Sequence, residues 1–468
     1  MSAEPAAAAT PANISTCIDE LSAMLGDRLT TSASVREHHG KDITHHAGHP
    51  PDAVVFANST EEVSEIVKVC ARHKTPIIAY GTGTSLEGHI AALQGGVCID
   101  VSQMNEVVEV NVDDMDITVQ PGVTRKQLNE YIRDTGLFFP IDPGADASLG
   151  GMTATRASGT NAVRYGTMRE NVLSLTAVMA DGRIIRTARR ARKSSAGYDL
   201  TRLMVGSEGT LGVITEVTVR LYGIPEAISA AVCSFETLEG AVETVIQTIQ
   251  VGIPIARIEL LDEVQMKAIN DYSKLDYPVE PTLFMEFHGS DAGVAEQAET
   301  VQELAGGNGG GEFAWTTRSE ERNKLWQARH DAAHAAANMR AGASIWATDV
   351  CVPISRLAEC IRETKKDLEG ASFPTPIVGH VGDGNFHLAF VLDGDNPDEI
   401  AEANAINDKL VMRALAMDGT CTGEHGVGYG KIDFLMAEHG EALSVMRTIK
   451  QALDPDNIMN PGKIIRMN

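Results

Sequence analysis

The sequence predicts an α+β protein with more than one domain, and three observations support this fold class. The chain has 468 residues, 43% of them hydrophobic and 22% charged, which is typical of globular proteins but too long for one compact core. Short helix and strand patterns alternate along its first half. Glycine-rich loops follow predicted strands, where backbone N–H groups can approach a ligand closely. We therefore expect at least two domains of mixed helix and sheet.

The first predicted helix begins after Ser59, in STEEVSEIVKVCARHK. Ser59 and Glu62 have the spacing of a capping box, and apolar residues then recur at helical intervals. These apolar residues are Val63, Ile66, Val67 and Cys70. The next segment, PIIAY, reads as a short buried strand and is followed by GTGTS at 81–85. This predicts a glycine-rich loop at the end of a strand.

Further elements follow the same logic. MDITVQPG predicts a strand, and Thr124 with Gln127 predicts a second capped helix. LSLTAVMADGRIIRT predicts two strands joined by a hairpin at Asp181-Gly182, and LGVITEVTVRL a strand that ends near Leu221. Between these elements, residues 142–171 are so rich in Gly, Ala, Ser and Thr that we expect little apolar surface there and a segment that wraps a ligand.

The domain boundary is predicted at Pro225. We expect an N-terminal tail and helical lead-in at 1–45, a cofactor domain at 46–224, a second α+β domain at 225–418 and a C-terminal segment at 419–468. The second domain contains the predicted strand TLFMEFHG and a predicted glycine-rich loop, GGNGGG, at 306–311. No internal repeat is found.

Composition excludes several classes of partner. A net charge of -25 repels nucleic acid and anionic lipid surfaces. No stretch approaches the ~18 to 20 apolar residues of a transmembrane helix. The seven cysteines form no C-x-x-C pair, and the first sixteen residues lack the marks of a signal or transit peptide. These features predict a reduced compartment and a cytoplasmic protein, with a homodimer left open.

Five histidines near the N-terminus form a cluster that could be read as a metal site. They are His38, His39, His45, His46 and His49. They lie in a polar stretch before Pro50-Pro51, so we expect them to be solvent-exposed rather than metal ligands.

Four glycine-rich segments together indicate a flavin site. GTGTS lacks the G-x-G-x-x-G spacing of a Rossmann fold because position 86 is Leu, which disfavours an NAD site. The ordered set of GTGTS, PGADASLGG, ASGTNAVRYG and GSEGTLGVIT resembles the FAD domain of the vanillyl-alcohol oxidase and p-cresol methylhydroxylase superfamily. The resemblance implies a two-subdomain FAD-binding domain of the p-cresol methylhydroxylase type, an α+β cap domain, and a C-terminal segment that returns to the flavin.

By this resemblance, the FAD contacts come from all four segments and from the terminal MNPGK. The implied residues are Tyr80, Gly81, Thr82, Gly83, Thr84, Ser85, Pro143, Gly144, Ala145, Ser148, Gly151, Met152, Ser158, Gly159, Asn161, Tyr165, Glu208, Gly209, Gly212, Ile214 and Asn460. Some relatives attach FAD through a His where this sequence has Thr84, so we expect non-covalent FAD.

Two motifs supply the chemistry of alcohol oxidation. VGHVGDGNFH places His380 and His387 on either side of a turn, and GTCTGEHGVGYGK places Glu424 and His425 in a glycine-lined loop. Two His and a carboxylate are a common ligand set for a catalytic metal, which can acidify a substrate hydroxyl, and another His can accept the proton. Taken alone, such a His pair is also compatible with a structural turn.

From Glu321 onward, LWQARHDAAHAA, TDVCVPISRL, GHVGDGNFH, GTCTGEHGVGYGK and LDPDNIMNPGK resemble the FAD-linked D-lactate dehydrogenases of the cytochrome type. The resemblance extends over nearly the whole chain from about His38. It implies that His380, His387 and Glu424 bind one divalent metal, Zn, Mn or Fe. It also implies that His425 is the base and that Arg329 binds the substrate carboxylate.

The implied reaction is FAD-dependent, metal-assisted oxidation of a D-2-hydroxy acid. Positions that hold a second carboxylate in dicarboxylate-specific relatives are Ala333, Ala347 and Ala389 here, so D-lactate is the expected substrate. D-2-hydroxyglutarate and glycolate remain the alternatives, as does oxidase activity with O₂. A non-catalytic flavin-binding protein is disfavoured because the implied base, the metal ligands and the carboxylate clamp all occur in one chain. The expected acceptor is cytochrome c, a quinone or an electron-transfer flavoprotein.

Overall fold

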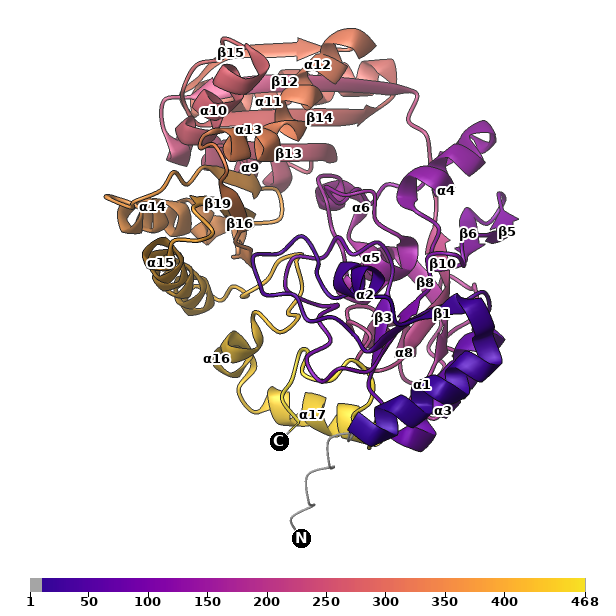
Figure 1. Cartoon of the computed structure of the whole chain (residues 1–468). Helices are drawn as coiled ribbons and strands as arrows, with labels where there is room; N and C mark the ends of the chain where they lie inside the picture. Colours follow the sequence, from indigo (N-terminus) through magenta and orange to yellow (C-terminus); the bar gives the residue numbers. More distant parts are fainter. Residues whose placement is uncertain (1–10, 468) are drawn as a thin grey trace. The chain divides into compact units, whose positions relative to one another are not determined.

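The computed structural model describes residues 11–467, which divide into two units. Unit 1 holds the described residues 11–158, 167–223 and 424–467, and unit 2 holds 159–166 and 224–423. Each unit combines helices with β-sheet, as Figure 1 shows, so the predicted α+β class is confirmed. No helix among the described residues has the length and apolar character needed to cross a membrane.

Unit 1 contains two main sheets with short helices. Its helices are α1 (Pro11–Leu25), α2 (Ala33–His39), α3 (Thr60–His73), α4 (Arg125–Ile132), α5 (Leu149–Thr155), α7 (Met168–Asn171), α8 (Leu200–Met204), α16 (Leu435–His439) and α17 (Ala442–Leu453), with 3₁₀ turns η1 (Gly26–Arg28), η2 (Arg133–Thr135) and η4 (Ile432–Phe434). Its strands are β1 (Leu29–Thr30), β2 (Ala53–Phe56), β3 (Ile77–Tyr80), β4 (Val97–Asp100), β5 (Val107–Asn111), β6 (Asp116–Val119), β7 (Leu137–Phe138), β8 (Val172–Val178), β9 (Ile184–Arg186), β10 (Val213–Arg220) and β11 (Tyr222–Gly223).

The first sheet of unit 1 has the order β1-β2-β4-β3, and β4 runs parallel to both β2 and β3. Its core packs Leu21 of α1 and Ile66 of α3 against Ile99 of β4, all fully buried. Each such side chain contributes about 1.5–3 kcal/mol by leaving water. The C-terminal segment also joins this core, because Met459 forms a parallel bridge with Ile77. The end of the chain is thereby fixed beside β3.

The predicted capping box of α4 is confirmed, whereas only one half of the predicted box of α3 forms, because Glu62 Oε2 accepts from the Asn58 backbone N–H instead. The Ser59 side chain accepts a hydrogen bond from the Glu62 backbone N–H at the start of α3. Thr124 and Gln127 form a reciprocal capping box at the start of α4. These side chains satisfy N–H groups that a helix start leaves without intrahelical partners.

The second sheet of unit 1 is antiparallel, in the order β5-β6-β10-β8-β9. The predicted hairpin between β8 and β9 is confirmed: Gly182 turns at a φ of +80°, and Val178 pairs with Ile184. The small-residue stretch 142–171 differs from our expectation of little apolar surface. It forms three short helices, α5, α6 (Ala162–Tyr165) and α7, and Leu149, Met152 and Met168 are buried.

The histidine-rich stretch also differs from the prediction of exposed side chains. His39 is buried, its Nε2 lies 2.9 Å from Asp100 Oδ2, and its Nδ1 lies 2.8 Å from the Val35 carbonyl. His45, His46 and His49 are half-buried, and only His38 of the five is exposed. Histidine combines an apolar ring with two polar nitrogens, so a neighbouring carboxylate makes burial favourable.

Unit 2 is built on one large sheet. Its helices are α6 (Ala162–Tyr165), α9 (Leu238–Gln250), α10 (Glu263–Ser273), α11 (Asp291–Gly307), α12 (Ser319–His330), α13 (Ala332–Asn338), α14 (Leu357–Asp367) and α15 (Pro397–Ala416), with the 3₁₀ turn η3 (Ile354–Arg356). Its strands are β12 (Ala227–Phe235), β13 (Ile255–Leu261), β14 (Thr282–Gly289), β15 (Gly310–Thr316), β16 (Ser344–Ala347), β17 (Val350–Cys351), β18 (Ile377–His380) and β19 (Asn385–Leu392).

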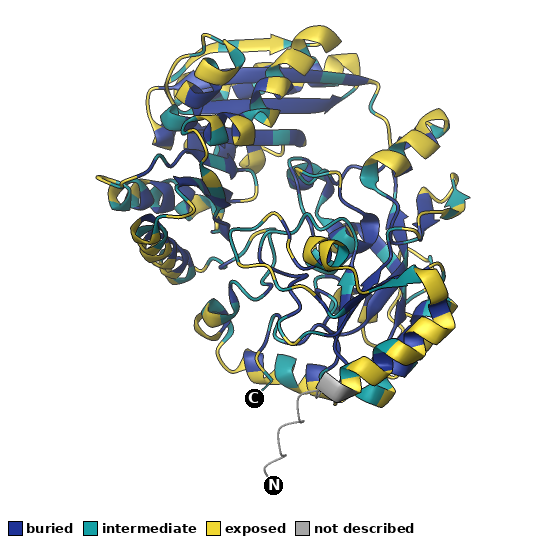
Figure 2. Ribbon diagram, viewed as in Figure 1, coloured by how far each residue is buried: buried dark blue, intermediate teal, exposed yellow. Residues whose placement is uncertain are grey.

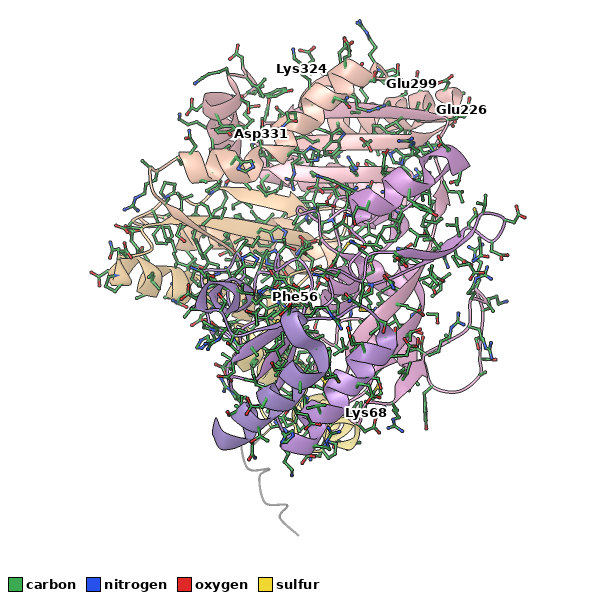
Figure 3. All side chains as sticks on the ribbon, turned by 45° about the vertical axis from the view of Figure 1, so that its right-hand side comes forward. Phe56, Lys68, Glu226, Glu299, Lys324 and Asp331 are labelled. Carbon is green, nitrogen blue, oxygen red and sulfur yellow. The ribbon has the colours of Figure 1, made fainter. Side chains whose placement is uncertain are left out.

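This antiparallel sheet has the order β15-β12-β14-β13-β18-β19-β16, and β17 also pairs with β19. One face packs on α10, α12 and α13, with Leu261, Met266 and Trp326 in the shared core. Figure 2 shows this burial as dark strands under helices whose outer sides are exposed. Charged side chains such as Glu299 and Lys324 lie on the outward sides of α11 and α12 (Figure 3).

The predicted loop GGNGGG at 306–311 is shorter than expected. Helix α11 continues to Gly307 and β15 begins at Gly310, which leaves only two residues between them. Gly309, with a φ of +80°, makes the tight turn. The other glycines take helical or extended conformations because the flanking elements supply their hydrogen bonds.

Candidate active site

Unit 1 contains a pocket lined almost entirely by small residues from the ends of its strands and from α5. The lining residues are Ala79, Tyr80, Gly81, Val101, Pro121, Gly150, Gly151, Ala154, Gly209, Gly212, Val213 and Ile214. Among the residues predicted to bind FAD, the lining includes Tyr80, Gly81, Gly151, Gly209, Gly212 and Ile214. The other lining residues were missed, although their positions at strand ends beside glycines were a usable signal.

The GTGTS loop requires glycine at two positions. A side chain at Gly81 would lie 2.5 Å from Ser148 Oγ, and Gly83 has a φ of +65°. A side chain at Gly83 would also come within 2.6 Å of the Tyr80 hydroxyl. The Ser148 hydroxyl is buried and has no hydrogen-bond partner among the described residues. Cβ atoms added at the lining residues Gly81 and Gly151 would both lie within 3.2 Å of this hydroxyl. Close backbone approach beside a polar atom without a partner fits a phosphate-bearing cofactor.

The other predicted cofactor residues in the loops of unit 1 lie near the pocket segments but outside its lining. The Thr82 and Thr84 hydroxyls are 3.2 Å apart, and the Ser85 hydroxyl donates to Asp42 over 3.1 Å. Pro143, Gly144 and Ala145 form the turn before α5, where Gly144 is exposed. Met152 is buried within α5, and Ser158 ends this part of unit 1.

Three predicted cofactor residues belong to unit 2. They are Gly159, Asn161 and Tyr165. Asn161 Oδ1 accepts a hydrogen bond from Arg257 Nε over 3.0 Å, and the Tyr165 hydroxyl lies 2.8 Å from His288 Nδ1. Both contacts tie this short segment to strands of unit 2.

Glu208 and Asn460 form hydrogen bonds within unit 1. The Glu208 carboxylate accepts hydrogen bonds from the backbone N–H groups of Val427 (2.7 Å) and Gly428 (2.8 Å). Asn460 Nδ2 donates to the carbonyls of Glu208 (2.7 Å) and His89 (3.0 Å). Glu208 therefore holds the GEHGVG loop, which carries His425, on the body of unit 1.

His425, the predicted base, lies beside a buried ionic group. Its Nδ1 is 3.7 Å from Glu87 Oε1, and Lys431 Nζ is 3.1 Å from the same oxygen. Burial alone would raise the pKa of Glu87, but Lys431 and His425 outweigh it and hold that pKa well below its usual value. Gly428 is required here because any side chain would overlap the Glu87 carbonyl. Glu87 was missed by the sequence reasoning.

In unit 2, the sheet brings His380 and His387 together. Val378 pairs with His387 across β18 and β19, so His380, two residues after Val378, shares the face of His387. The two ring centroids are 5.4 Å apart. This agrees with our expectation that the two imidazoles lie on adjacent strands.

Hydrogen bonds fix the orientation of both imidazoles. His380 Nδ1 lies 2.8 Å from Glu259 Oε1, and His387 Nδ1 lies 2.8 Å from the Thr348 carbonyl. A carboxylate and a carbonyl only accept, so Nδ1 is the donor in each ring and Nε2 carries the lone pair. This is the arrangement of metal-binding histidines, in which Nδ1 is held by an oxygen and Nε2 faces the metal.

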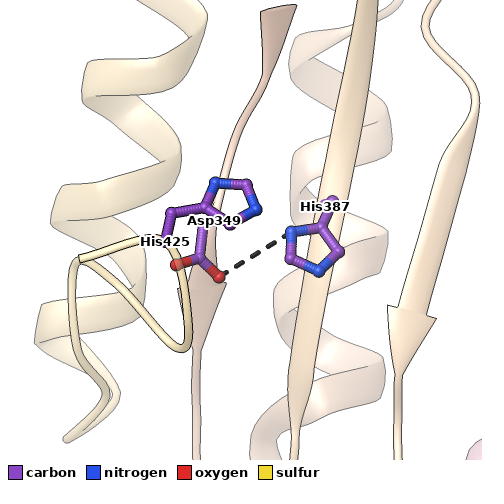
Figure 4. Close-up of side chains that lie close together, drawn as sticks. All are labelled: Asp349, His387 and His425. Carbon is purple, nitrogen blue, oxygen red and sulfur yellow. Dashed lines mark ion pairs between the residues drawn. The ribbon is translucent and has the colours of Figure 1, made fainter. Parts of the chain in front are cut away.

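Asp349 supports the same face of the sheet and was not predicted. Its Oδ1 lies 3.7 Å from His387 Nδ1, the ion pair drawn in Figure 4, and it accepts from Asn385 Nδ2 over 2.7 Å. Its Oδ2 accepts from the Thr422 hydroxyl over 2.7 Å. Thr422 thus holds the end of unit 2 beside His387, and Glu424 follows two residues later.

Arg329, the predicted carboxylate clamp, pairs with Glu259. Its Nε and Nη2 lie 3.0 and 2.6 Å from Glu259 Oε2. Glu259 has no exposed surface. Burial would raise the pKa of Glu259, but His380 and Arg329 outweigh it, so the pKa is lowered. The sequence held a signal for Glu259, a charged residue inside the apolar strand pattern of IARIELL.

Three alanines led us to expect a monocarboxylate substrate, and two of them lie on the unit 2 sheet. Ala347 and Ala389 pair directly across β16 and β19, and Ala389 shares the face of His387. Ala333 is exposed in the first turn of α13. Two of the three positions therefore border the histidines.

Comparison with known proteins identifies the family. Residues 51–188 match the FAD binding domain family, and residues 224–464 match the FAD linked oxidases, C-terminal domain. The probable mitochondrial D-lactate dehydrogenase of Danio rerio is 54% identical over 98% of this chain and 93% of its own length. The mitochondrial D-lactate dehydrogenase [cytochrome] of Arabidopsis thaliana is 50% identical over 96% and 80%. The chain belongs to the FAD-linked D-lactate dehydrogenase family.

One further relative and one solved structure extend this result. A glycolate oxidase subunit of Bacillus subtilis is 34% identical over 88% of this chain and 89% of its own length. The structure of p-cresol methylhydroxylase with substrate bound superposes with a TM-score of 0.78 at 19% identity, over 98% of each chain. The predicted family, the p-cresol methylhydroxylase fold and an FAD-dependent dehydrogenase of D-2-hydroxy acids are confirmed.

The predicted cytoplasmic location is wrong. The Danio rerio and Arabidopsis thaliana members of the D-lactate dehydrogenase family are both named as mitochondrial enzymes. The acidic composition and the scattered cysteines without a C-x-x-C pair suggested a reducing environment, and such features do not distinguish one reducing compartment from another. Residues 1–10, part of the N-terminal segment from which the location was judged, lie outside the described residues.

Proposed function

We propose that this chain oxidises D-lactate to pyruvate with non-covalently bound FAD and one divalent metal, Zn, Mn or Fe. The observation that carries the proposal is the arrangement on one face of the unit 2 sheet. There, Arg329 is held by Glu259, and the same carboxylate holds His380 beside His387. The names of the two most similar relatives reported above support D-lactate as the substrate.

The metal would be held by His380, His387 and Glu424. The fixed Nδ1 bonds support this assignment because they turn both Nε2 atoms away from Glu259 and Thr348. The position of Glu424 is limited by the chain itself. Thr422 is bonded to Asp349, and successive Cα atoms are only about 3.8 Å apart, so Glu424 cannot lie far from the His387 strand.

Bound FAD would supply the acceptor for a hydride from C2 of the substrate, and a bound metal would supply a Lewis acid that lowers the pKa of the substrate hydroxyl. Arg329 would bind the substrate carboxylate through the guanidinium edge that does not face Glu259. His425 would take the hydroxyl proton on Nε2, because its Nδ1 lies toward Glu87. One hydride and one proton leave D-lactate, which gives pyruvate.

A small monocarboxylate suits the proposed site better than a dicarboxylate. Ala347 and Ala389, side by side on β16 and β19, offer no charge or hydrogen bond to a second carboxylate. Leaving that charge buried without a partner would be costly. Glycolate is the second candidate, supported by the 34% identity to a glycolate oxidase subunit. For the electron acceptor, the name of the Arabidopsis thaliana relative supports a cytochrome over a quinone or a flavoprotein.

Anaerobic mixing with substrate tests the proposal. We expect D-lactate to bleach the visible absorbance of the flavin, L-lactate to leave it unchanged, and turnover with D-lactate to exceed that with glycolate and D-2-hydroxyglutarate. Acid precipitation should release the FAD into solution, and elemental analysis should find about one divalent metal per chain. A flavin that stays oxidised with every 2-hydroxy acid, or a preference for the dicarboxylate, would refute the assignment.

A further inference from the structure

We infer that Glu259 is a positioning residue. Its carboxylate orients both Arg329, the proposed carboxylate clamp, and His380, a proposed metal ligand. The inference rests on the proposed roles of Arg329 and His380. Glu259 lies on β13 with no exposed surface, and each of its oxygens serves one partner. Oε2 accepts from Arg329, 70 residues away in sequence, and Oε1 accepts from His380, 121 residues away. One carboxylate therefore connects two groups from different elements.

The contact with Arg329 leaves a defined edge of the guanidinium for substrate. Glu259 occupies the side formed by Nε and Nη2, at 3.0 and 2.6 Å. The end formed by Nη1 and Nη2 is the other edge that matches a carboxylate, and two parallel N–H···O bonds can form there. The structure shows no second carboxylate bonded to Arg329 among the described residues. Glu259 thus selects which edge receives the substrate.

The contact with His380 selects a tautomer. The Oε1 atom of Glu259 lies on Nδ1 of His380, so in a neutral ring Nδ1 carries the hydrogen and Nε2 carries the lone pair. The hydrogen bond also orients the ring toward its neighbour His387. A carboxylate behind a metal-bound histidine commonly tunes both orientation and basicity.

The shared carboxylate has a consequence for substrate choice. In a 2-hydroxy acid the carboxylate and the hydroxyl stand on adjacent carbons, so the clamp and the metal must be held at one fixed separation. Glu259 fixes both from a buried strand in which neither oxygen can move without losing a partner. The geometry makes Glu259 the residue that matches the site to 2-hydroxy acids.

Glu259→Gln tests this inference because the amide is uncharged and has one accepting oxygen, so one partner loses its acceptor and the other loses the charge that strengthens its hydrogen bond. We expect two separate losses in the purified flavoprotein. Mn²⁺ affinity, measured by titrating the metal-depleted holoflavoprotein and following free Mn²⁺ by electron paramagnetic resonance, should fall about 10- to 100-fold. At saturating Mn²⁺, the KM for D-lactate should rise about 10-fold while kcat changes less, as expected for a lost substrate-binding contact.

The matched control is Glu399→Gln. Glu399 is also a buried carboxylate paired with an arginine of unit 2, Arg340, at 2.8 and 3.0 Å, and it contacts neither Arg329 nor His380. This control should lose stability comparably but keep Mn²⁺ affinity and KM. Losses of the same size in both variants would reduce Glu259 to a structural role, and a change in only one of the two measurements would overturn its double role.

Two further variants keep the test decisive if Glu259→Gln does not fold. Arg329→Met keeps the bond between Glu259 and His380, whereas the double variant Arg329→Met/Glu259→Leu removes it without leaving a buried cation unpaired. Weaker Mn²⁺ binding in the double variant than in Arg329→Met supports the role of Glu259 in metal binding, and equal binding overturns that role. If wild-type flavin is not reduced by any 2-hydroxy acid, the proposed function fails, and the Mn²⁺ titrations still report on Glu259 itself.

Discussion

The pocket of unit 1 and the polar face of unit 2 are built from different kinds of residue. The polar face is the side of the unit 2 sheet that carries Glu259, His380 and His387. More than half of the residues that line the pocket are glycines and alanines, so much of its shape comes from the backbone. The polar face consists of charged and imidazole side chains such as Arg329, Glu259 and His387, each held by hydrogen bonds. Substitutions that add atoms should therefore impair the pocket, and substitutions that remove side-chain atoms should impair the polar face.

The largest effect is expected for His425→Ala. This variant removes the proposed base while leaving the pocket of unit 1 intact, so FAD should stay bound. Loss of a general base typically slows the chemical step about 10²- to 10⁴-fold. Stopped-flow reduction of the flavin by D-lactate under anaerobic conditions measures it directly.

His46→Ala is the matched control for His425. His46 Nε2 lies 3.6 Å from Glu87 Oε2, so this substitution removes an imidazole beside the same carboxylate. It should leave flavin reduction close to the wild-type rate. Equal slowing in both variants would mean that the Glu87 cluster, rather than a base at His425, determines the rate.

Arg329→Lys is expected to have an intermediate effect. The substitution keeps the charge but replaces a planar fork with a single ammonium, which cannot bind Glu259 and a substrate carboxylate along two edges. One charge-assisted hydrogen bond contributes about 1.5–3 kcal/mol, which corresponds to about a 10- to 150-fold loss in kcat/KM. Steady-state kinetics with D-lactate check this, and an unchanged kcat/KM would show that Arg329 does not bind the carboxylate.

The two regions also differ in how much the sequence revealed. Ser59 and Thr124 cap helices within three residues of their partners, so local pattern was enough to place α3 and α4. The glycine-rich loops are equally local, and several of their residues line the pocket. Local chemistry therefore predicted these helices and identified several residues that line the pocket of unit 1.

The polar face depends on contacts between residues far apart in the chain. Glu259 meets Arg329 and His380 across 70 and 121 residues, and Asp349 meets Thr422 across 73. Strand register brings these side chains together, and no spacing in the sequence encodes it. His380, His387 and Arg329 were proposed through family resemblance, whereas Glu259 and Asp349, which position them, emerged only from the structure.

The smallest effect is expected for Gly83→Ala, which adds one methyl group to the GTGTS loop. Gly83 has a φ of +65°, and the new Cβ would lie 2.6 Å from the hydroxyl of Tyr80, a residue of the pocket lining. Tyr80 must shift to relieve this overlap. A loss of about 1.4 kcal/mol in binding corresponds to a tenfold weaker FAD affinity, and we expect a change of about this size.

Gly136→Ala separates displacement of Tyr80 from backbone strain. Gly136 has a φ of +76°, close to that of Gly83, but a methyl group added there would meet no described atom within 4 Å. A left-handed conformation costs an L-residue about 1–2 kcal/mol, so both variants should lower the melting temperature of the apoprotein similarly. Only Gly83→Ala should weaken FAD binding, measured by fluorescence as FAD dissociates. Equal FAD affinity in the two variants would mean that the loop tolerates the added methyl group and that the pocket is less dependent on backbone approach than its glycines indicate.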